Sequence, residues 1–338
     1  MTVHIGIIGA GRAGLIHAKA FLHHVKQGEL VALCDPNQQA RAAARRELGV
    51  NVVATADELL ATNIDAVVIT TPTKHHHDAV LKAAAAGKHI LCEKPMAITA
   101  QECRAMIAAT HRAGVKLQIG FMRRFDLGHR RAKELIEQGA IGDIVSVTSL
   151  THGPSVPHPW MYDLQASNGP LAEVSSHDID ALRWFTGAEI TSVYAIAGNF
   201  RSAEAHDHSP DYYDTVLLTA RFSNGTLGHI NGAQGVRYGY DSRVEIHGTT
   251  GRIDIGDLNA NRVVVSGAQG SSYRDTVPSW RTLYHDAYSA EDAAFVDAII
   301  HDTEPLATGE DGLAAVEVVQ AGNTSITTGK IQYLNTAR

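Results

Sequence analysis

The fold is decided by residues 3–14, which read VHIGIIGAGRAG. The first half is a short apolar run, typical of a buried strand, and the second half places glycines at positions 9, 11 and 14, in the spacing G-x-G-x-x-G. Residues 13–26 then follow with helical periodicity. In a strand–loop–helix unit of this kind, Gly9 permits the tight turn, Gly11 admits a pyrophosphate to the backbone, and Gly14 lets helix and strand pack closely. The segment predicts a dinucleotide site.

Two further features of this segment bear on the cofactor. Arg12 and Ala13 stand at the start of the helix, where free N–H groups favour an anion. The second expected strand, 30–34, ends at Asp35, on schedule for a carboxylate that binds the adenine ribose and repels a 2′-phosphate. NAD is therefore expected rather than NADP, with Arg12 or Arg41 left as candidate phosphate contacts. The alternative is a glycine-rich turn in an unrelated α/β protein, which the combination of strand, motif, helix and Asp35 argues against.

The first third of the chain alternates short buried strands with helices. This alternation predicts a Rossmann domain at residues 1–121, a doubly wound parallel sheet covered on both faces. Thr99 is expected to cap one of its helices. The expected strands are 3–8, 30–34, 52–54, 66–70, 89–92 and 116–120, and the expected helices are 13–26, 38–48, a short one from 57, 76–86 and 99–113.

The pattern changes near residue 121. Residues 122–338 are expected to form an α+β domain with a mostly antiparallel open sheet, because alternating strands follow one another with hairpin turns at 223–225 and 249–251. The fold class is thus α/β for the first domain with an α+β second domain. The expected strands are 143–150, 190–197, 215–222, 226–233, 244–248 and 262–265, and the expected helices are 127–138, 173–186, 290–301 and 310–328.

Composition narrows the class of protein. The chain has 338 residues with 29 Lys and Arg against 36 Asp and Glu, a net charge of −7, which disfavours nucleic acid as a partner. No stretch is long and apolar enough to span a bilayer, and the first residues do not form a signal region. Three cysteines, with Cys34 and Cys92 inside apolar runs, suit a reducing compartment. We expect a cytoplasmic protein.

Four segments carry a resemblance to a known family. They read TPTKHH at 71–76, GKHILCEKPMA at 87–97, GFMRRF at 120–125 and GPLAEVSSHDID at 169–180. In this order they resemble landmarks of the Gfo/Idh/MocA family of oxidoreductases over nearly the whole chain, and the third is similar to a segment prominent among inositol dehydrogenases. The second and fourth segments are far more specific than the glycine motif.

The resemblance implies functional residues. It transfers a catalytic set to Lys94, Glu173 and His177, although the family usually has Asp where this chain has Glu173. It also implies a homo-oligomer, a dimer or tetramer. The cofactor contacts that it adds to the glycine motif are Thr71, Pro72, His76, Glu93 and Lys94.

The chemistry of alcohol oxidation suits these residue types. A base must take the hydroxyl proton, and the developing alkoxide must be stabilised, while hydride leaves. On one helix spanning 173–186, Glu173, His177 and Asp180 would share a face, so that the carboxylate could orient the imidazole. We assign His177 as acid/base, Glu173 as its partner and Lys94 as charge stabiliser. A Glu–His pair at this spacing is commonly just a solvated pair, and Asp180 either binds a substrate hydroxyl or anchors the helix.

Other side chains are candidates for substrate or metal. The Pro- and aromatic-containing loop 151–165 offers His158 and Trp160, with Tyr162 beside them, and Arg124 is a further candidate substrate contact. A purely structural loop is the alternative. Metal is not expected despite 19 histidines, because the side chains of the consecutive residues 75–77 diverge and no paired zinc motif is present.

Together these observations predict an NAD-dependent dehydrogenase that oxidises a secondary hydroxyl of a cyclic polyol or sugar, with an inositol-like substrate favoured. Three alternatives stand beside it: a sugar or glycoside dehydrogenase acting on a pyranose, a non-catalytic NAD-binding regulator, and redox-neutral glycoside hydrolysis with tightly held NAD. A regulator would be expected to lose Lys94 or His177, and this chain keeps both.

Overall fold

The computed structural model describes residues 1–205 and 207–335. Cα packing divides the chain into two compact units. The first comprises residues 1–126 and 285–316, and the second comprises residues 127–284 and 317–338. The domain boundary that we predict after residue 121 remains a prediction; the packing adds that a late segment, 285–316, belongs with the N-terminal residues.

The first unit is built on a six-stranded parallel sheet, as the sequence predicts. Its order is β3-β2-β1-β4-β5-β6, so the chain starts at the centre, moves to one edge and then crosses back to the other. This is the doubly wound arrangement. The strands are β1 (Val3–Ile8), β2 (Gly28–Cys34), β3 (Asn51–Val53), β4 (Ala66–Ile69), β5 (His89–Glu93) and β6 (Leu117–Gly120).

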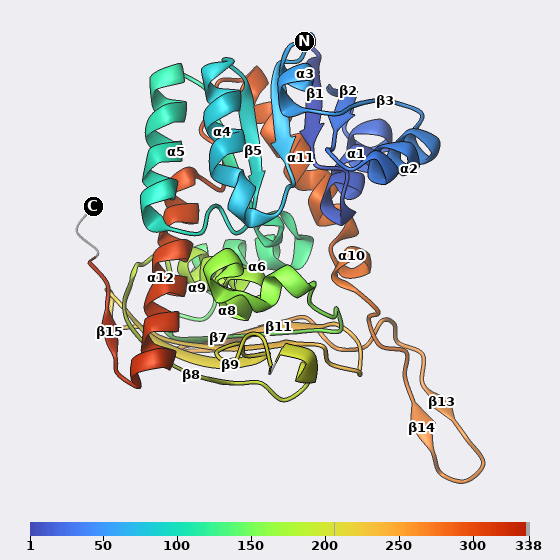
Figure 1. Cartoon of the computed structure of the whole chain (residues 1–338). Helices are drawn as coiled ribbons and strands as arrows, with labels where there is room; N and C mark the ends of the chain where they lie inside the picture. Colours follow the sequence, from blue (N-terminus) through green and yellow to red (C-terminus); the bar gives the residue numbers. More distant parts are fainter. Residues whose placement is uncertain (206, 336–338) are drawn as a thin grey trace. The chain divides into compact units, whose positions relative to one another are not determined.

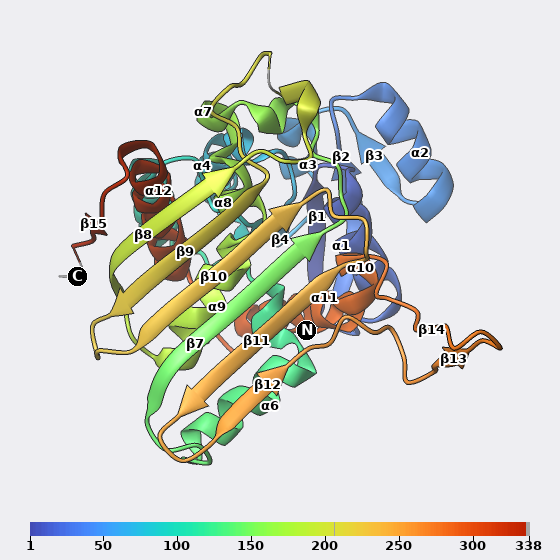
Figure 2. The same cartoon turned by 90° about the horizontal axis from the view of Figure 1, so that it is seen from below.

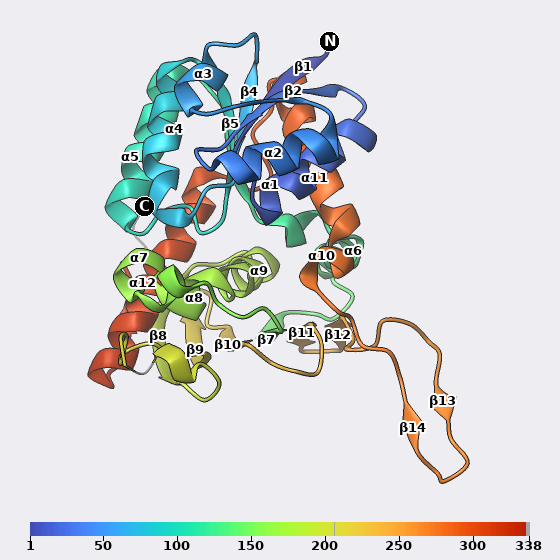
Figure 3. The same cartoon turned by 45° about the vertical axis from the view of Figure 1, so that its right-hand side comes forward.

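Helices cover both faces of this sheet (Figure 3), with α1, α2 and α11 on one side and α4 and α5 on the other. The core on the α1 side includes Ile5 and Ile7 of β1 packed with Phe21 and Phe295, all buried. Thr99 caps α5 as predicted, since its side chain accepts the N–H of Glu102. The helices are α1 (Arg12–His23), α2 (Gln38–Leu48), α3 (Ala56–Leu60), α4 (His76–Ala85), α5 (Ala100–Ala113) and α11 (His285–Ile300), with short 3₁₀ turns η1 (Thr73–His75) and η2 (Met122–Phe125).

The second unit contains a seven-stranded sheet of order β12-β11-β7-β10-β9-β8-β15. Every pairing is antiparallel except that of β10 with β7. The predicted mostly antiparallel sheet is confirmed. The strands are β7 (Ile144–Gly153), β8 (Ile190–Gly198), β9 (Thr215–Phe222), β10 (Leu227–Gln234), β11 (Asp241–Gly248), β12 (Arg252–Ile255) and β15 (Gln332–Tyr333).

One prediction for this sheet is wrong. We expect a strand at 262–265, but the strand that extends the sheet is β12, directly after the turn at 249–251. Residues 257–277 instead form an arm that extends away from the sheet (Figure 1), whose two sides pair through β13 (Val265–Ser266) and β14 (Ser272–Tyr273) and through a bridge between Asn259 and Thr276. The apolar run Val263–Val265 carries the signal of a buried strand, but these side chains are exposed. The prediction fails because an apolar run that does not alternate with polar residues gives no information about which side chains are buried.

Helices cover one face of the second sheet, and Figure 2 looks onto the other face. Next to the sheet lie α6 (Leu127–Glu137), α8 (Gly169–Glu173) and α9 (Ser176–Thr186). Between α6 and α8 come η3 (Pro159–Tyr162) and α7 (Leu164–Ser167), and after α9 come η4 (Ala203–Ala205) and α10 (Trp280–Leu283). Helix α12 (Gly309–Thr328) contributes its second part to this unit, where Ser325 Oγ accepts the N–H of Ala195, 3.0 Å away.

The predicted single helix over 173–186 is also wrong. It is two helices, because α8 ends at Glu173 and α9 begins at Ser176. Pro170 in the first turn of α8 starts a short helix, and the N–H groups of Val174 and Ser175 both bond to its carbonyl, which closes that helix. Glu173 and His177 are therefore not one turn apart on a common helix, and helical spacing does not place the carboxylate beside the imidazole.

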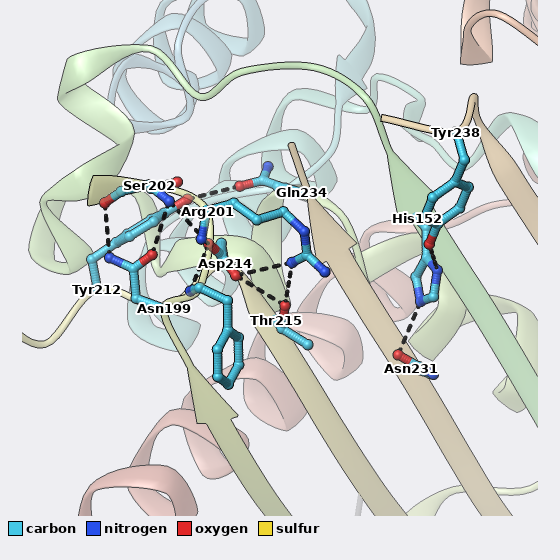
Figure 4. Close-up of polar contacts among 11 residues, drawn as sticks. His152, Asn199, Arg201, Ser202, Tyr212, Asp214, Thr215, Asn231, Gln234 and Tyr238 are labelled. Carbon is cyan, nitrogen blue, oxygen red and sulfur yellow. Dashed lines mark hydrogen bonds and ion pairs between the residues drawn. The ribbon is translucent and has the colours of Figure 1, made fainter. Parts of the chain in front are cut away.

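Polar side chains fix the loop between β8 and β9 (Figure 4). The buried carboxylate of Asp214 accepts the N–H groups of Phe200, Arg201 and Ser202 and the hydroxyl of Thr215. Arg201 also places Nη1 3.2 Å from Asp214 Oδ1. One carboxylate thus accepts the backbone N–H groups of three consecutive residues in the turn that follows β8.

No helix among the described residues is long and apolar enough to cross a membrane.

Candidate active site

Three neighbouring strands of the first unit end in the segments that sequence analysis singles out. Residues 9–14 follow β1, residues 71–72 follow β4, and residues 93–95 close β5. These strands are adjacent and parallel, so their carboxyl ends lie along one edge of the sheet. Ligands of open α/β sheets bind at this edge. The glycine loop, Thr71 and the Glu93-Lys94 pair are thus brought to the same edge.

The glycine loop is shaped for a dinucleotide. Gly9 has φ 109°, a conformation that favours glycine, and a Cβ on Gly14 would collide with the carbonyl oxygen of Gly9. A Cβ on Gly11, in contrast, would meet no atom within 4 Å. Gly11 caps α1 without a side-chain hydrogen bond, and both Gly11 and Arg12 are exposed. The free N–H groups of the first turn, from Arg12 and Ala13 onward, therefore face an open position suited to a pyrophosphate.

Asp35 is tied into the same loop. Its Oδ2 accepts the N–H of Ala10 at 2.9 Å, and its Oδ1 accepts the N–H of Asn37 at 2.8 Å. Each carboxylate oxygen can accept a second bond, so a ribose hydroxyl would still find an acceptor here. The guanidinium of Arg41 donates to the carbonyls of Asp35 and Pro36, both at 2.9 Å, which engages this candidate phosphate contact with the backbone.

His76 joins two of the recognised segments. Its ring nitrogens lie 2.8 Å from the carbonyl oxygen of Thr71 and 2.9 Å from that of Pro95. Burial lowers the pKa of His76, although the two carbonyls oppose this. The ring is only 1% exposed, so it holds the backbones after β4 and β5 together. Nearby, the buried Oγ1 of Thr71 has no hydrogen-bond partner among the described residues, as expected of a group that contacts a ligand.

Lys94 follows Glu93 at the end of β5 and is half-buried. Its backbone N–H donates to Oε2 of Glu93 at 3.0 Å, and its peptide bond to Pro95 is cis. The Glu93 side chain itself is 6% exposed. Gly120 makes room for it, because a Cβ there would lie 3.0 Å from Glu93 Oε2. The side chain of Glu93 is thus buried inside the first unit and bonded to the backbone of Lys94.

Helix α9 of the second unit carries His177 and Asp180, which are 6% and 1% exposed. Their spacing on one helix agrees with the prediction that they share a face. The helix is fastened to the sheet by Asp178, whose Oδ1 accepts the hydroxyls of Ser149 at 2.6 Å and Thr151 at 2.7 Å. Sequence reasoning missed Asp178. Its position between the two recognised residues was a signal, but its partners on β7 lie 27 and 29 residues earlier.

The candidate substrate contacts fall into different surroundings. Arg124 is buried in the first unit, with Nη2 2.9 Å from Asp311 Oδ1 and Nη1 donating to the carbonyl of Leu306 at 2.6 Å. His158 is exposed and Trp160 half-buried, at the start of η3 in the second unit. Tyr162 is buried, and its hydroxyl donates to Glu204 at 2.7 Å. The roles of Arg124, His158 and Trp160 toward a substrate stay predictions.

A second imidazole in the second unit was not singled out by its sequence. His152, near the end of β7, contacts the hydroxyl of Tyr238 and lies 3.0 Å from the side-chain oxygen of Asn231 on β10 (Figure 4). These residues are 79 and 86 positions apart from it in the chain, so no local pattern could have joined them.

The parallel sheet, the glycine loop with its open position at Gly11, and Lys94 at the same sheet edge define a dinucleotide-dependent oxidoreductase. Comparison with known families agrees. Residues 3–121 match the oxidoreductase family with an NAD-binding Rossmann fold, and residues 129–254 match the GFO/IDH/MocA C-terminal domain. The chain belongs to the GFO/IDH/MocA oxidoreductase family, and NAD is its cofactor.

Characterised relatives cover almost the whole chain. It is 34% identical to scyllo-inositol 2-dehydrogenase (NAD(+)) of Bacillus subtilis over 99% of this chain and 97% of that one. It is also 34% identical to an inositol 2-dehydrogenase of Rhizobium meliloti, over 96% and 97%. Among solved structures, scyllo-inositol dehydrogenase from Lactobacillus casei, with bound NAD(H) and scyllo-inositol, is 30% identical with a TM-score of 0.89, over 98% and 99% of the chains.

Proposed function

We propose that this protein oxidises a secondary hydroxyl of a cyclic polyol, with an inositol as the favoured substrate. The observation that carries the proposal is the edge of the parallel sheet, where the loop that fits a dinucleotide follows β1 and Lys94 follows β5, with β4 between the two strands. The similarity to inositol dehydrogenases over nearly the full length of the chain supports the substrate class.

NAD, when bound, supplies a two-electron acceptor at its nicotinamide ring. The protein's part is to handle the proton and the charge. We assign His177 as the base that takes the hydroxyl proton, while the C–H bond of the same carbon breaks and hydride leaves, so that a ketone forms. The ammonium of Lys94 stabilises the negative charge that develops on the oxygen. Asp180 is proposed to bind a neighbouring hydroxyl of the polyol.

Glu173 keeps a place in this proposal for a different reason than helical spacing. The resemblance assigns a carboxylate to this position, and Glu173 is half-buried at the end of α8, three residues before α9 begins at Ser176. Because Glu173 and His177 are on separate helices, the carboxylate can orient the ring only if residues 174–175 keep the two helices in a fixed relative position. We therefore propose Glu173 as an orienting partner whose effect is smaller than that of His177.

The experiment is a panel of cyclic polyols and pyranoses with purified protein and NAD, followed by the appearance of NADH. Turnover with at least one inositol is expected, and Lys94→Ala and His177→Ala should abolish it while NAD binding remains. Stronger turnover with a pyranose would make the protein a sugar dehydrogenase. Unchanged turnover in both variants would refute the catalytic assignment, and NAD binding without any turnover would favour a regulator.

We also propose that the protein is a homo-oligomer that uses the uncovered face of the second sheet. On this face Ile196 of β8 pairs with Leu217 of β9, and they are 53% and 37% exposed. Tyr194 and Leu227 add exposed apolar surface on β8 and β10. Exposed apolar side chains on an uncovered sheet face are typical of protein interfaces, and the mass of the protein in solution tests the proposal. The three cysteines are free and buried, which agrees with the cytoplasm as the proposed compartment.

A further inference from the structure

The interior of the first unit contains a histidine between two carboxylates. His17 lies on α1, three residues after Gly14, and its side chain is fully buried. Glu93 ends β5, and Asp292 lies on α11, where it is also fully buried. The three residues come from widely separated parts of the chain. Their meeting links the dinucleotide helix, the strand that ends at Lys94 and a late helix of the same unit.

The hydrogen-bond geometry fixes the charge of this group. Nδ1 of His17 lies 2.7 Å from Asp292 Oδ1, and Nε2 lies 3.2 Å from Glu93 Oε1. An ionised carboxylate can only accept, so both ring nitrogens must carry a proton to make both bonds. Burial by itself lowers the pKa of His17, but the charges and hydrogen bonds of Asp292 and Glu93 outweigh it and raise this pKa well above its usual value. Burial also raises the pKa of Asp292, against the charge and hydrogen bond of His17. The two contacts of the ring and the raised pKa of His17 together favour an imidazolium.

Glu93 connects His17 to the backbone of Lys94. One carboxylate oxygen of Glu93 faces His17, and the other accepts the backbone N–H of Lys94 at 3.0 Å. Burial alone raises the pKa of Glu93, but the hydrogen bond and charge of His17 and the charge of Lys94 outweigh it, and the pKa lies below its usual value. The carboxylate is thus ionised and held at both oxygens, with the backbone of Lys94 attached to one of them.

A metal ion is the competing interpretation of the same residues. Ligand atoms of His17, Glu93 and Glu291 lie within 4.8 Å of one another. An ion bound there would need a lone pair from a ring nitrogen of His17, and both nitrogens already face carboxylate oxygens at hydrogen-bond distance. We take a proton as the occupant of this site, and the chelator experiment below distinguishes it from a cation.

We propose that His17 is a positioning residue for catalysis: the chain of contacts from Asp292 through His17 and Glu93 to the backbone of Lys94 holds the catalytic ammonium in place. The inference rests on the proposed function, because it assumes that Lys94 acts on the substrate. Stability alone is a poor reason for such a group, since a buried ion pair is often no more stabilising than apolar residues of similar volume. Its effect is expected on the placement of Lys94.

Two substitutions separate the two sides of the imidazole. In His17→Asn the side-chain amide nitrogen takes the place of Nδ1 and keeps the contact with Asp292, whereas in His17→Gln it takes the place of Nε2 and keeps the contact with Glu93. Because the path to Lys94 runs through Glu93, kcat should fall about 10- to 100-fold in His17→Asn and clearly less in His17→Gln. KM for NAD should stay near that of the wild type. His23→Asn, on the exposed face of the same helix, is the matched control.

A merely structural role predicts a different result: both variants would lose thermal stability alike, and the folded protein would keep the wild-type kcat. That result would overturn the inference. Nitrogen NMR of the histidines supplies a second measurement, with both ring nitrogens of His17 expected to remain protonated at pH 8. A cation bound at His17, detected in the purified protein and removed by a chelator with loss of turnover, would also overturn it.

The failure of the inference can be distinguished from that of the proposed function. If Lys94→Ala keeps wild-type turnover, the proposed catalytic role of Lys94 is wrong and the inference falls with it. If Lys94→Ala loses turnover but His17→Asn does not, only the inference is wrong. If both lose turnover and His17→Gln retains more than His17→Asn, both stand.

Discussion

Replacing Asp178 tests how α9 is held beside the sheet. The carboxylate is fully buried and accepts hydroxyls from Ser149 and Thr151 at 2.6 and 2.7 Å. A hydrogen bond to a charged group contributes about 1.5–3 kcal/mol, so Asp178→Ala should lower the free energy of unfolding of the second unit by about 3–6 kcal/mol. Asp178→Asn keeps an oxygen acceptor without the charge and should cost roughly half as much.

The assay is thermal and urea unfolding, followed by circular dichroism. For a unit of 150–250 residues, each kcal/mol shifts the melting temperature by about 2–4 °C, so Asp178→Ala should melt about 6–24 °C lower. Thr151→Val removes one hydroxyl at nearly constant volume and should cost about one bond, roughly 1.5–3 kcal/mol. Wild-type stability in Asp178→Ala, or a loss in Thr151→Val as large as that in Asp178→Ala, would refute the reasoning.

Two more predictions concern the first unit. Gly11→Ala should keep the melting temperature but weaken NAD binding in a titration, because a Cβ there meets only open space, whereas Gly14→Ala should lose about 1–3 kcal/mol of stability as well, through overpacking; equal melting of the two variants would contradict this. Nδ1 of His89 accepts the N–H of Lys116 at 3.0 Å, and burial, together with the charge of Lys116, lowers the pKa of His89, so its contribution to stability is complete above about pH 6.5 and is lost as the pH falls through the folded-state pKa. His89→Asn keeps an acceptor that does not titrate and should flatten the loss of melting temperature between neutral and acidic pH; an unchanged slope would rule out His89 as its source.

Most of the first unit could be predicted from the sequence because its signals are local. Each strand is a short apolar run, and several of the helices that follow begin at a capping side chain, such as Asn37 before α2 or Thr99 before α5. The glycine loop is equally local, since strand, turn and helix follow one another between residues 3 and 23. Where the physical cause lies within one turn or one strand, the sequence pattern is sufficient.

The features that could not be predicted depend on partners far along the chain. No sequence pattern near His17 predicts its contact with Asp292, which lies 275 residues later. The break between Glu173 and Ser176 was hidden for another reason: the N–H groups of Val174 and Ser175 bond to the carbonyl of Pro170, which lies before the start of the predicted helix. Spacing arguments hold only within one helix, which is why the pairing of Glu173 with His177 does not follow from their numbers.

The single parallel pairing in the second sheet has a consequence for the order of folding. Strands β8, β9 and β10 are antiparallel neighbours, and the turn between β9 and β10 is short, so these contacts can form early. Strand β7 pairs later, because its parallel partner β10 begins about 80 residues further along the chain. The entropy of closing this long loop is lost before the strand pairing contributes any stability. Nascent chains that have left the ribosome only as far as β9 would therefore expose both edges of β7, since its two partners β10 and β11 come later, and unpaired strand edges favour aggregation.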